Sequence, residues 1–169
     1  PQGAADASIL SSTMPKPKVK DLQEANAALR RLMQNDQPIK ICNIPLSALR
    51  LLVFSDSSLN NTGDGKSQMG HMVCAVHADI HKGKESDCSI LLYKSHKSTK
   101  SGGSTLLTES QALSESLADV EWTASWIGLI KDLKYDLRDR NVLNREIQVQ
   151  GIISGDSDLQ LATVVDAKS

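Results

Sequence analysis

Three carboxylates, Asp56, Glu109 and Asp166, stand at positions from which they could share a metal site. Asp56 comes at the end of the apolar run 49–54, and Asp166 directly follows the apolar run 161–165, so both aspartates end expected buried strands. Carboxylate oxygens are preferred ligands of hard divalent cations such as Mg²⁺. Two such ions can activate a water molecule and stabilise the leaving oxygen in phosphodiester hydrolysis. For one aspartate alone, a turn or cap role is the stronger interpretation, and only their joint placement favours a metal site.

Glu109 belongs to an expected long helix that Ser104 caps. A helical wheel places Glu109 on the side of Leu113, Val120 and Ile127, so its carboxylate faces the expected sheet. Burying an ionised carboxylate costs several kcal/mol unless it is paired or holds a metal. The alternative is an acid near the helix start that the helix dipole stabilises, and the wheel alone favours this alternative.

The elements that must position these carboxylates follow from apolar periodicity. Amphipathic spacing predicts a helix over 19–34, and three runs with short polar links predict an antiparallel meander. A long helix and a further strand come next, so we expect an α/β or α+β fold with helices on a mixed sheet. The expected extended segments are 39–44, 49–54, 69–77, 88–94, a weaker 147–153, and 161–166.

The net charge of the chain does not indicate a particular class of partner, because 19 basic residues nearly balance 20 acidic ones. A polyanion must therefore be held by a local patch or by metal ions. Lys94, Lys97 and Lys100, in a Ser- and Gly-rich segment before the long helix, are candidates for contacts with nucleic-acid phosphates. A solvated loop explains these lysines equally well.

The three cysteines, Cys42, Cys74 and Cys88, are far apart and form no C-x-x-C pair. Their spacing indicates neither a zinc site nor a disulfide framework, so we expect a reducing, intracellular location, cytoplasmic or nuclear. No apolar stretch is long enough for a membrane span, and no secretion signal is visible. The chain starts at Pro1 and stops at Ser169 just after an apolar run, as a piece cut from a longer protein would.

Several short segments, in order, resemble the ribonuclease H domain of copia-type retrotransposon polyproteins. The segment 20–32, with KDLQEAN followed by LRRL, also resembles the part of such polyproteins that links reverse transcriptase to this nuclease. The resemblance extends from about Val19 to Ser169. The segments that carry it are VFSDSS at 53–58 with KSQMG at 66–70, STLLTESQAL at 104–113, and VVDAKS at 164–169.

The resemblance implies a ribonuclease H-like fold, truncated after its fourth strand. It divides the chain into a linker or disordered leader at 1–18, a connection from reverse transcriptase at 19–47, and an incomplete nuclease domain at 48–169. The implied substrate is an RNA–DNA hybrid whose RNA strand is cleaved with two Mg²⁺ ions, or Mn²⁺ in their place. Asp56 is expected to contact both ions, and Glu109 and Asp166 one each. The upstream reverse transcriptase domain is the implied protein partner.

One departure from the family leaves other hypotheses open. In such nucleases a fourth acidic residue comes from a later helix, which this sequence does not contain after Asp166. The chain could instead be a degenerate, noncatalytic remnant that binds nucleic acid or has a structural role. An unrelated small metal-binding domain is a third hypothesis, which a strand order inconsistent with a mixed five-strand sheet would favour.

Overall fold

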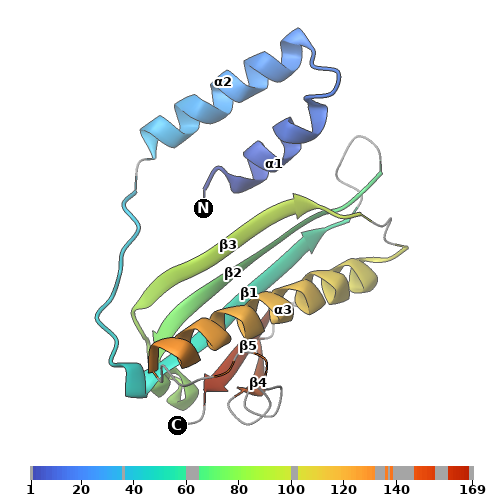
Figure 1. The fold of residues 1–169 in the computed structure, drawn as a ribbon. Helices are drawn as coiled ribbons and strands as arrows, with labels where there is room; N and C mark the ends of the chain where they lie inside the picture. Colours follow the sequence, from blue (N-terminus) through green and yellow to red (C-terminus); the bar gives the residue numbers. More distant parts are fainter. Residues whose placement is uncertain are drawn as a thin grey trace.

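An antiparallel sheet and three α-helices make up the part of the chain that the structure, a computed structural model, describes: residues 2–35, 37–59, 65–99, 103–131, 136, 138, 147–154 and 160–167. The fold is of the α+β class, with one long helix lying across the sheet and two N-terminal helices beyond its β3 edge (Figure 1). The helices are α1 (Ala4–Thr13), α2 (Val19–Gln34) and α3 (Thr105–Lys131), and the strands are β1 (Leu49–Ser58), β2 (Gln68–His77), β3 (Cys88–Lys97), β4 (Ile147–Ser154) and β5 (Gln160–Ala167). Two short 3₁₀ helices, Leu46–Ala48 and Ala78–Lys82, precede β1 and follow β2.

The strand order is β3-β2-β1-β5-β4. The predicted meander is confirmed, because β1 pairs with β2 and β2 with β3, both antiparallel. The prediction of a mixed sheet is wrong for the pairings that the structure describes, since β5 also runs antiparallel to β1, from Leu51 opposite Val165 to Phe54 opposite Ala162.

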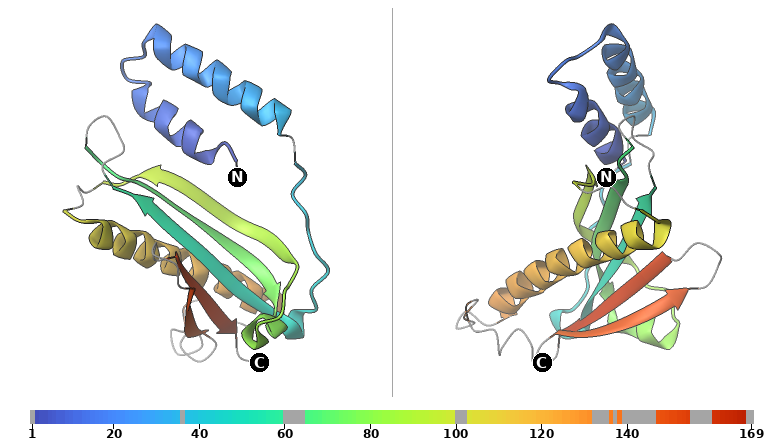
Figure 2. Two further views of the ribbon diagram at one scale, coloured as in Figure 1. Left: turned by 180° about the vertical axis from the view of Figure 1, so that it is seen from behind. Right: turned by 90° about the vertical axis from the view of Figure 1, so that its right-hand side faces the viewer.

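The path of the chain after α3 explains this direction. The first turn of α3 touches the end of β1, while Ile127, near the other end of α3, packs with Leu51 near the start of β1. A strand that followed α3 directly and joined β1 would therefore run parallel to β1. In the structure β4 takes that direction at the edge of the sheet, and β5 returns antiparallel as its hairpin partner (Figure 2).

The larger of two buried apolar clusters lies between α3 and the sheet. It joins Leu51 and Val53 of β1 and Val73 of β2 to Val120, Ala124 and Ile127 of α3, the helix face that the sequence predicts. The N-terminal half of α3 buries small side chains instead, so this part of the helix can lie close to the strands. These small buried residues are Thr108, Ala112 and Ser116.

The N-terminal segment differs from the predicted unstructured leader, because residues 4–13 form α1. Alanines favour this helix, although its sequence has no apolar period that would reveal it. Tertiary contacts hold α1 in place: Gln68 Nε2 donates to Ser8 Oγ at 3.1 Å, and Asp6 pairs with Arg31 of α2 at 3.1 Å. The leader is thus attached to both β2 and α2.

Helix α2 has the predicted bounds, but α1 covers little of its apolar face. Asp21 accepts a hydrogen bond from the backbone N–H of Lys18 at 2.7 Å and so caps the helix start. Ala28 is the buried residue of α2, whereas Leu22, Leu29 and Met33 are each more than half exposed.

None of the described helices is long and apolar enough to cross a membrane.

We expect Val53→Ala to lower the free energy of unfolding by about 2 kcal/mol, because it removes buried methyl groups and leaves a cavity against α3. Val53 is 0% exposed, whereas Leu91 of β3 is 46% exposed. Urea unfolding followed by circular dichroism measures both Val53→Ala and the control Leu91→Ala, which should cost less than about 1 kcal/mol. Equal losses for the two variants would contradict this placement of the core.

Candidate functional site

The end of β1 and the start of α3 meet through two buried hydroxyl groups. Ser57 Oγ donates to Thr108 Oγ1 at 3.1 Å, and Thr108 Oγ1 donates in turn to the carbonyl of Thr105 at 2.8 Å. Ser104 begins the helix as predicted, because its Oγ accepts the backbone N–H of Leu107 at 3.2 Å. The contact between Ser57 and Thr108 brings their chain neighbours, Asp56 and Glu109, to the same end of the sheet.

The side chains of Asp56 and Glu109 nevertheless have different surroundings at this junction. Ser57 points toward α3, so Asp56, the preceding residue of the strand, projects from the opposite face of the sheet. Asp56 is exposed, and its Oδ1 accepts the backbone N–H of Ser57 at 2.8 Å. Glu109 is half-buried, at the border of the buried stripe of α3 and not in its centre.

Asp166 lies near the other end of β1. Val165 pairs with Leu51, so Asp166 continues this register to the level of Arg50. Arg50 is six residues from Asp56, which is roughly 20 Å at the usual rise of about 3.3 Å per residue. The structure therefore does not bring Asp166 together with Asp56 and Glu109. In this arrangement the three carboxylates do not fit one shared pair of Mg²⁺ ions, and no group of three or more His, Cys, Asp or Glu within the described residues could hold a metal ion.

The predicted phosphate-binding lysines belong mainly to a strand. Lys94 lies inside β3, and its Nζ is 2.7 Å from the carboxylate of Asp119, which neutralises part of its charge. Lys97 is the last residue of β3 and pairs with Gln68 of β2 in the register of the sheet. Lys100 lies outside the described residues.

A charged cluster that the sequence did not reveal joins α3 to β2 and β3. His71 Nε2 lies 2.6 Å from Asp119 Oδ2, and only 2% of the His71 side chain is exposed. Beside this pair, His96 Nε2 lies 2.8 Å from Glu115 Oε2. Burial acts to raise the pKa of Asp119, but hydrogen bonds from Lys94 and His71 outweigh it and hold that pKa below its ordinary value.

The spacing of its residues on α3 and β3 explains how this cluster forms and which elements it joins. The signal in the sequence that could have revealed the cluster is a match of spacings between two elements. Glu115 and Asp119 are four residues apart on one helix face, and Lys94 and His96 are two apart on one strand face, so the two pairs can meet. The cluster borders a groove of about 400 Å³. Its hydrogen bonds and the ion pair of Lys94 with Asp119 join α3 to β2 and β3 beside the apolar core.

Comparison with family models, with curated proteins and with solved structures finds no match to this chain. The assignment of a function therefore depends on the placement of the residues and on the resemblance of the short motifs.

Asp119→Asn should lower the free energy of unfolding by about 2–3 kcal/mol at neutral pH, because the buried His71 loses its charged partner. The pKa of Asp119 is lowered by folding, so its contribution is present above the unfolded pKa of about 3.9 and is lost as the pH falls through the folded value. Urea unfolding between pH 3 and 7 should therefore show the difference from wild type shrinking below about pH 4. The control is Asp87→Asn, whose carboxylate is exposed in its ion pair with Lys40 and should change stability by less than about 0.5 kcal/mol. A difference that stays constant down to pH 3 would refute this role.

Thr108→Val should cost about 1–2 kcal/mol, because it keeps the side-chain shape but leaves the buried Ser57 hydroxyl without its acceptor. Replacing both residues, as Ser57→Ala with Thr108→Val, should cost less than the sum of the single changes. A double-mutant cycle from urea unfolding measures this coupling, expected at about 1 kcal/mol. Simple additivity would show that the two hydroxyl groups do not interact.

Proposed function

We propose that the chain is part of the ribonuclease H domain of a copia-type retrotransposon polyprotein. Its proposed reaction is the divalent-metal-dependent hydrolysis of the RNA strand of RNA–DNA hybrids, with Mg²⁺, or Mn²⁺ in its place, as cofactor. The observation that carries the proposal is the hydrogen bond between Ser57 and Thr108. It joins the segment 53–58 to the segment 104–113, two motifs of the family resemblance whose contacting residues are 51 positions apart in the chain.

The arrangement of the elements supports the same proposal. An antiparallel β1-β2-β3 meander followed by a long helix across its face is the order that the family resemblance implies for the first part of the nuclease. The uncovered apolar side of α2, with Leu22, Leu29 and Met33, is what a helix connecting to a preceding domain would present. We therefore also propose that α2 contacts a reverse transcriptase domain of the same polyprotein.

Roles within this proposal follow the placement of each residue. Asp56 and Glu109 are the proposed catalytic carboxylates, because they share the junction of β1 and α3. Asp166 belongs to the proposed site by family resemblance alone. Lys97 and Lys100 are proposed phosphate contacts, whereas Lys94 has its main contact with Asp119.

A second candidate function is a noncatalytic module that binds RNA–DNA hybrids without cutting them. The direction of β5 favours this candidate, because it places Asp166 at the level of Arg50 instead of Asp56. The side chain of Asp56 projects from the sheet face opposite α3, which also favours the noncatalytic module. The all-antiparallel pairing also departs from the mixed sheet that the nuclease family would have, which keeps an unrelated domain as a further alternative.

Cleavage of an RNA–DNA hybrid labelled on the RNA strand distinguishes these candidates. With Mg²⁺, the chain should cleave the hybrid but not a DNA duplex, and EDTA should stop the reaction. Asp56→Asn and Glu109→Gln should each reduce the rate by about 100-fold or more, because each removes a charge from the reacting site. Asp87→Asn, an exposed acid near the far end of the sheet, is the matched control and should cleave at the wild-type rate.

Each other result changes the assignment. Binding of the hybrid in a gel shift without cleavage by the wild-type chain would establish the noncatalytic module in place of the nuclease. Wild-type activity in Asp56→Asn would exclude the proposed site. Asp166→Asn isolates the third carboxylate: a rate loss like that of Asp56→Asn places it in the site, and an unchanged rate removes it.

A further inference from the structure

Three cysteines that are far apart in the sequence come together where the segment before β1 runs beside the start of β3. Cys42 lies in the segment that precedes β1, Cys74 lies in β2, and Cys88 begins β3. Cys42 Sγ is 3.5 Å from the carbonyl oxygen of Cys88, and the thiols of Cys74 and Cys88 interact with each other. All three are free thiols. Their sequence spacing gave no sign of this meeting, because the contacts join separate elements.

Two contacts align the segment around Cys42 with the start of β3. Lys40 Nζ lies 2.8 Å from Asp87 Oδ1, and the backbone N–H of Cys42 donates to Ser89 Oγ at 2.7 Å. Residues 40–42 thus run beside residues 87–89. This alignment holds Cys42 next to Cys88 even though its own thiol bond, to a carbonyl, is weak.

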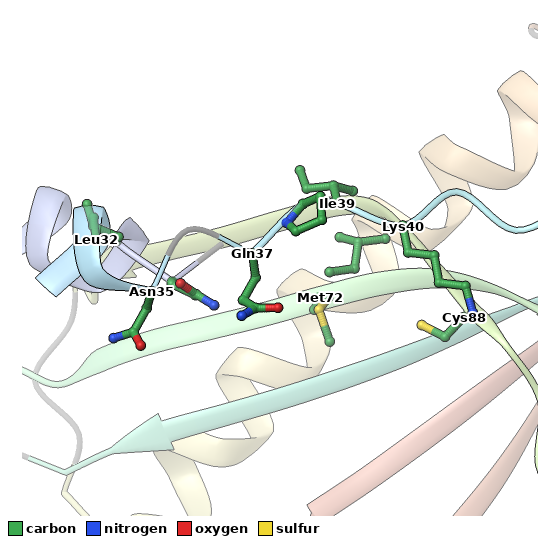
Figure 3. Close-up of a pocket in the computed structure, with 11 residues that line it drawn as sticks. Leu32, Asn35, Gln37, Ile39, Lys40, Met72 and Cys88 are labelled. Atoms are coloured by element: carbon green, nitrogen blue, oxygen red, sulfur yellow. The ribbon is translucent and has the colours of Figure 1, made fainter.

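Cys88 is open to small solutes. It is exposed and borders a groove of about 590 Å³ together with Lys40 and Met72 (Figure 3). Cys42 is partly exposed and borders an adjoining groove of about 440 Å³. Cys74 differs from both, because it is fully buried and burial raises its pKa to about 12. Cys74 therefore stays protonated near neutral pH, and a protonated thiol is not the nucleophile in disulfide chemistry.

We propose that Cys42 and Cys88 form an oxidation-sensitive pair, which a hydroperoxide converts into an intramolecular disulfide. The Cys88 thiolate attacks the terminal oxygen of the hydroperoxide, an S–O bond forms, the O–O bond breaks, and water or an alcohol leaves. The Cys42 thiolate then attacks the sulfur of the Cys88 sulfenic acid, an S–S bond forms, and the S–O bond breaks with loss of water. Overall the two thiols lose two protons and two electrons, and the hydroperoxide is reduced.

The disulfide would fix the segment that connects α2 to the sheet. That segment includes residues 37–42, which follow the N-terminal helices and lie along the start of β3 (Figure 3). A covalent bond at Cys42 would therefore restrict how α1 and α2 move relative to the sheet. Oxidation and reduction would switch this restraint on and off.

Treatment of the full chain with hydrogen peroxide tests the proposal. Peptide mapping by mass spectrometry without reductant should find a Cys42–Cys88 cross-link, and thiol titration should find two of the three thiols lost. The melting temperature should rise by roughly 5 °C or more, because the bond closes a long loop, and dithiothreitol should reverse the change. Cys74→Ala is the control variant and should keep the cross-link, while Cys42→Ser and Cys88→Ser should lose it.

The test is decided by which two cysteines are cross-linked. This is measured on the wild-type chain, so the result does not depend on how well a variant folds. A Cys74–Cys88 link, cross-links only between chains, or oxidation to sulfinic acid without any cross-link would each overturn the proposal. Repeating the oxidation in urea controls for the fold, because selective formation of the Cys42–Cys88 bond in the unfolded chain would show that the folded arrangement is not its cause.

Discussion

The packing of α3 against β1 and β2 is the interaction on which the remaining described contacts depend. Val53 and Val73 are completely buried beneath Val120, and this apolar contact sets the distance between helix and sheet. The helix can then approach closely enough for Thr108 to meet Ser57 and for Asp119 to reach His71. Larger side chains along the N-terminal half of α3 would hold it away from the strands and break both polar contacts.

The two faces of the sheet therefore have different characters. One face is covered by α3, with an apolar core and an ion pair, whereas the other carries a second buried cluster of Leu52, Cys74 and Val76, and the connection that leads from α2 runs beside the start of β3. Polar contacts of that connection, such as the pair of Lys40 with Asp87, are exposed and are each worth little in water. The connection itself is thus held to β3 by polar contacts that include an exposed ion pair, so a covalent bond between the connection and β3 would restrain it much more strongly.

Local signals in the sequence predicted the local parts of this structure. The bounds of α2, the meander of β1 to β3 and the cap at Ser104 follow from apolar period and from capping chemistry, which nearby residues determine. The meeting of His71 with Asp119, and of Cys42 with Cys88, joins positions 48 and 46 residues apart, and no periodicity encodes which distant positions will touch. Helix α1 escaped prediction for the same reason, because contacts with β2 and α2 hold a segment that has no apolar stripe.

The candidate site shows how one non-local choice can decide chemistry. An aspartate at the end of an apolar strand is easy to recognise, but the strand's direction determines at which end of the sheet that aspartate lies. Because α3 returns the chain to the start of β1, a strand that entered the sheet there beside β1 would bring its final residue to the level of Asp56. The edge strand β4 takes that path instead, and β5 returns to leave Asp166 at the level of Arg50. The same carboxylate thus joins Asp56 or is separated from it according to which strand lies next to β1, with no change in its own local sequence.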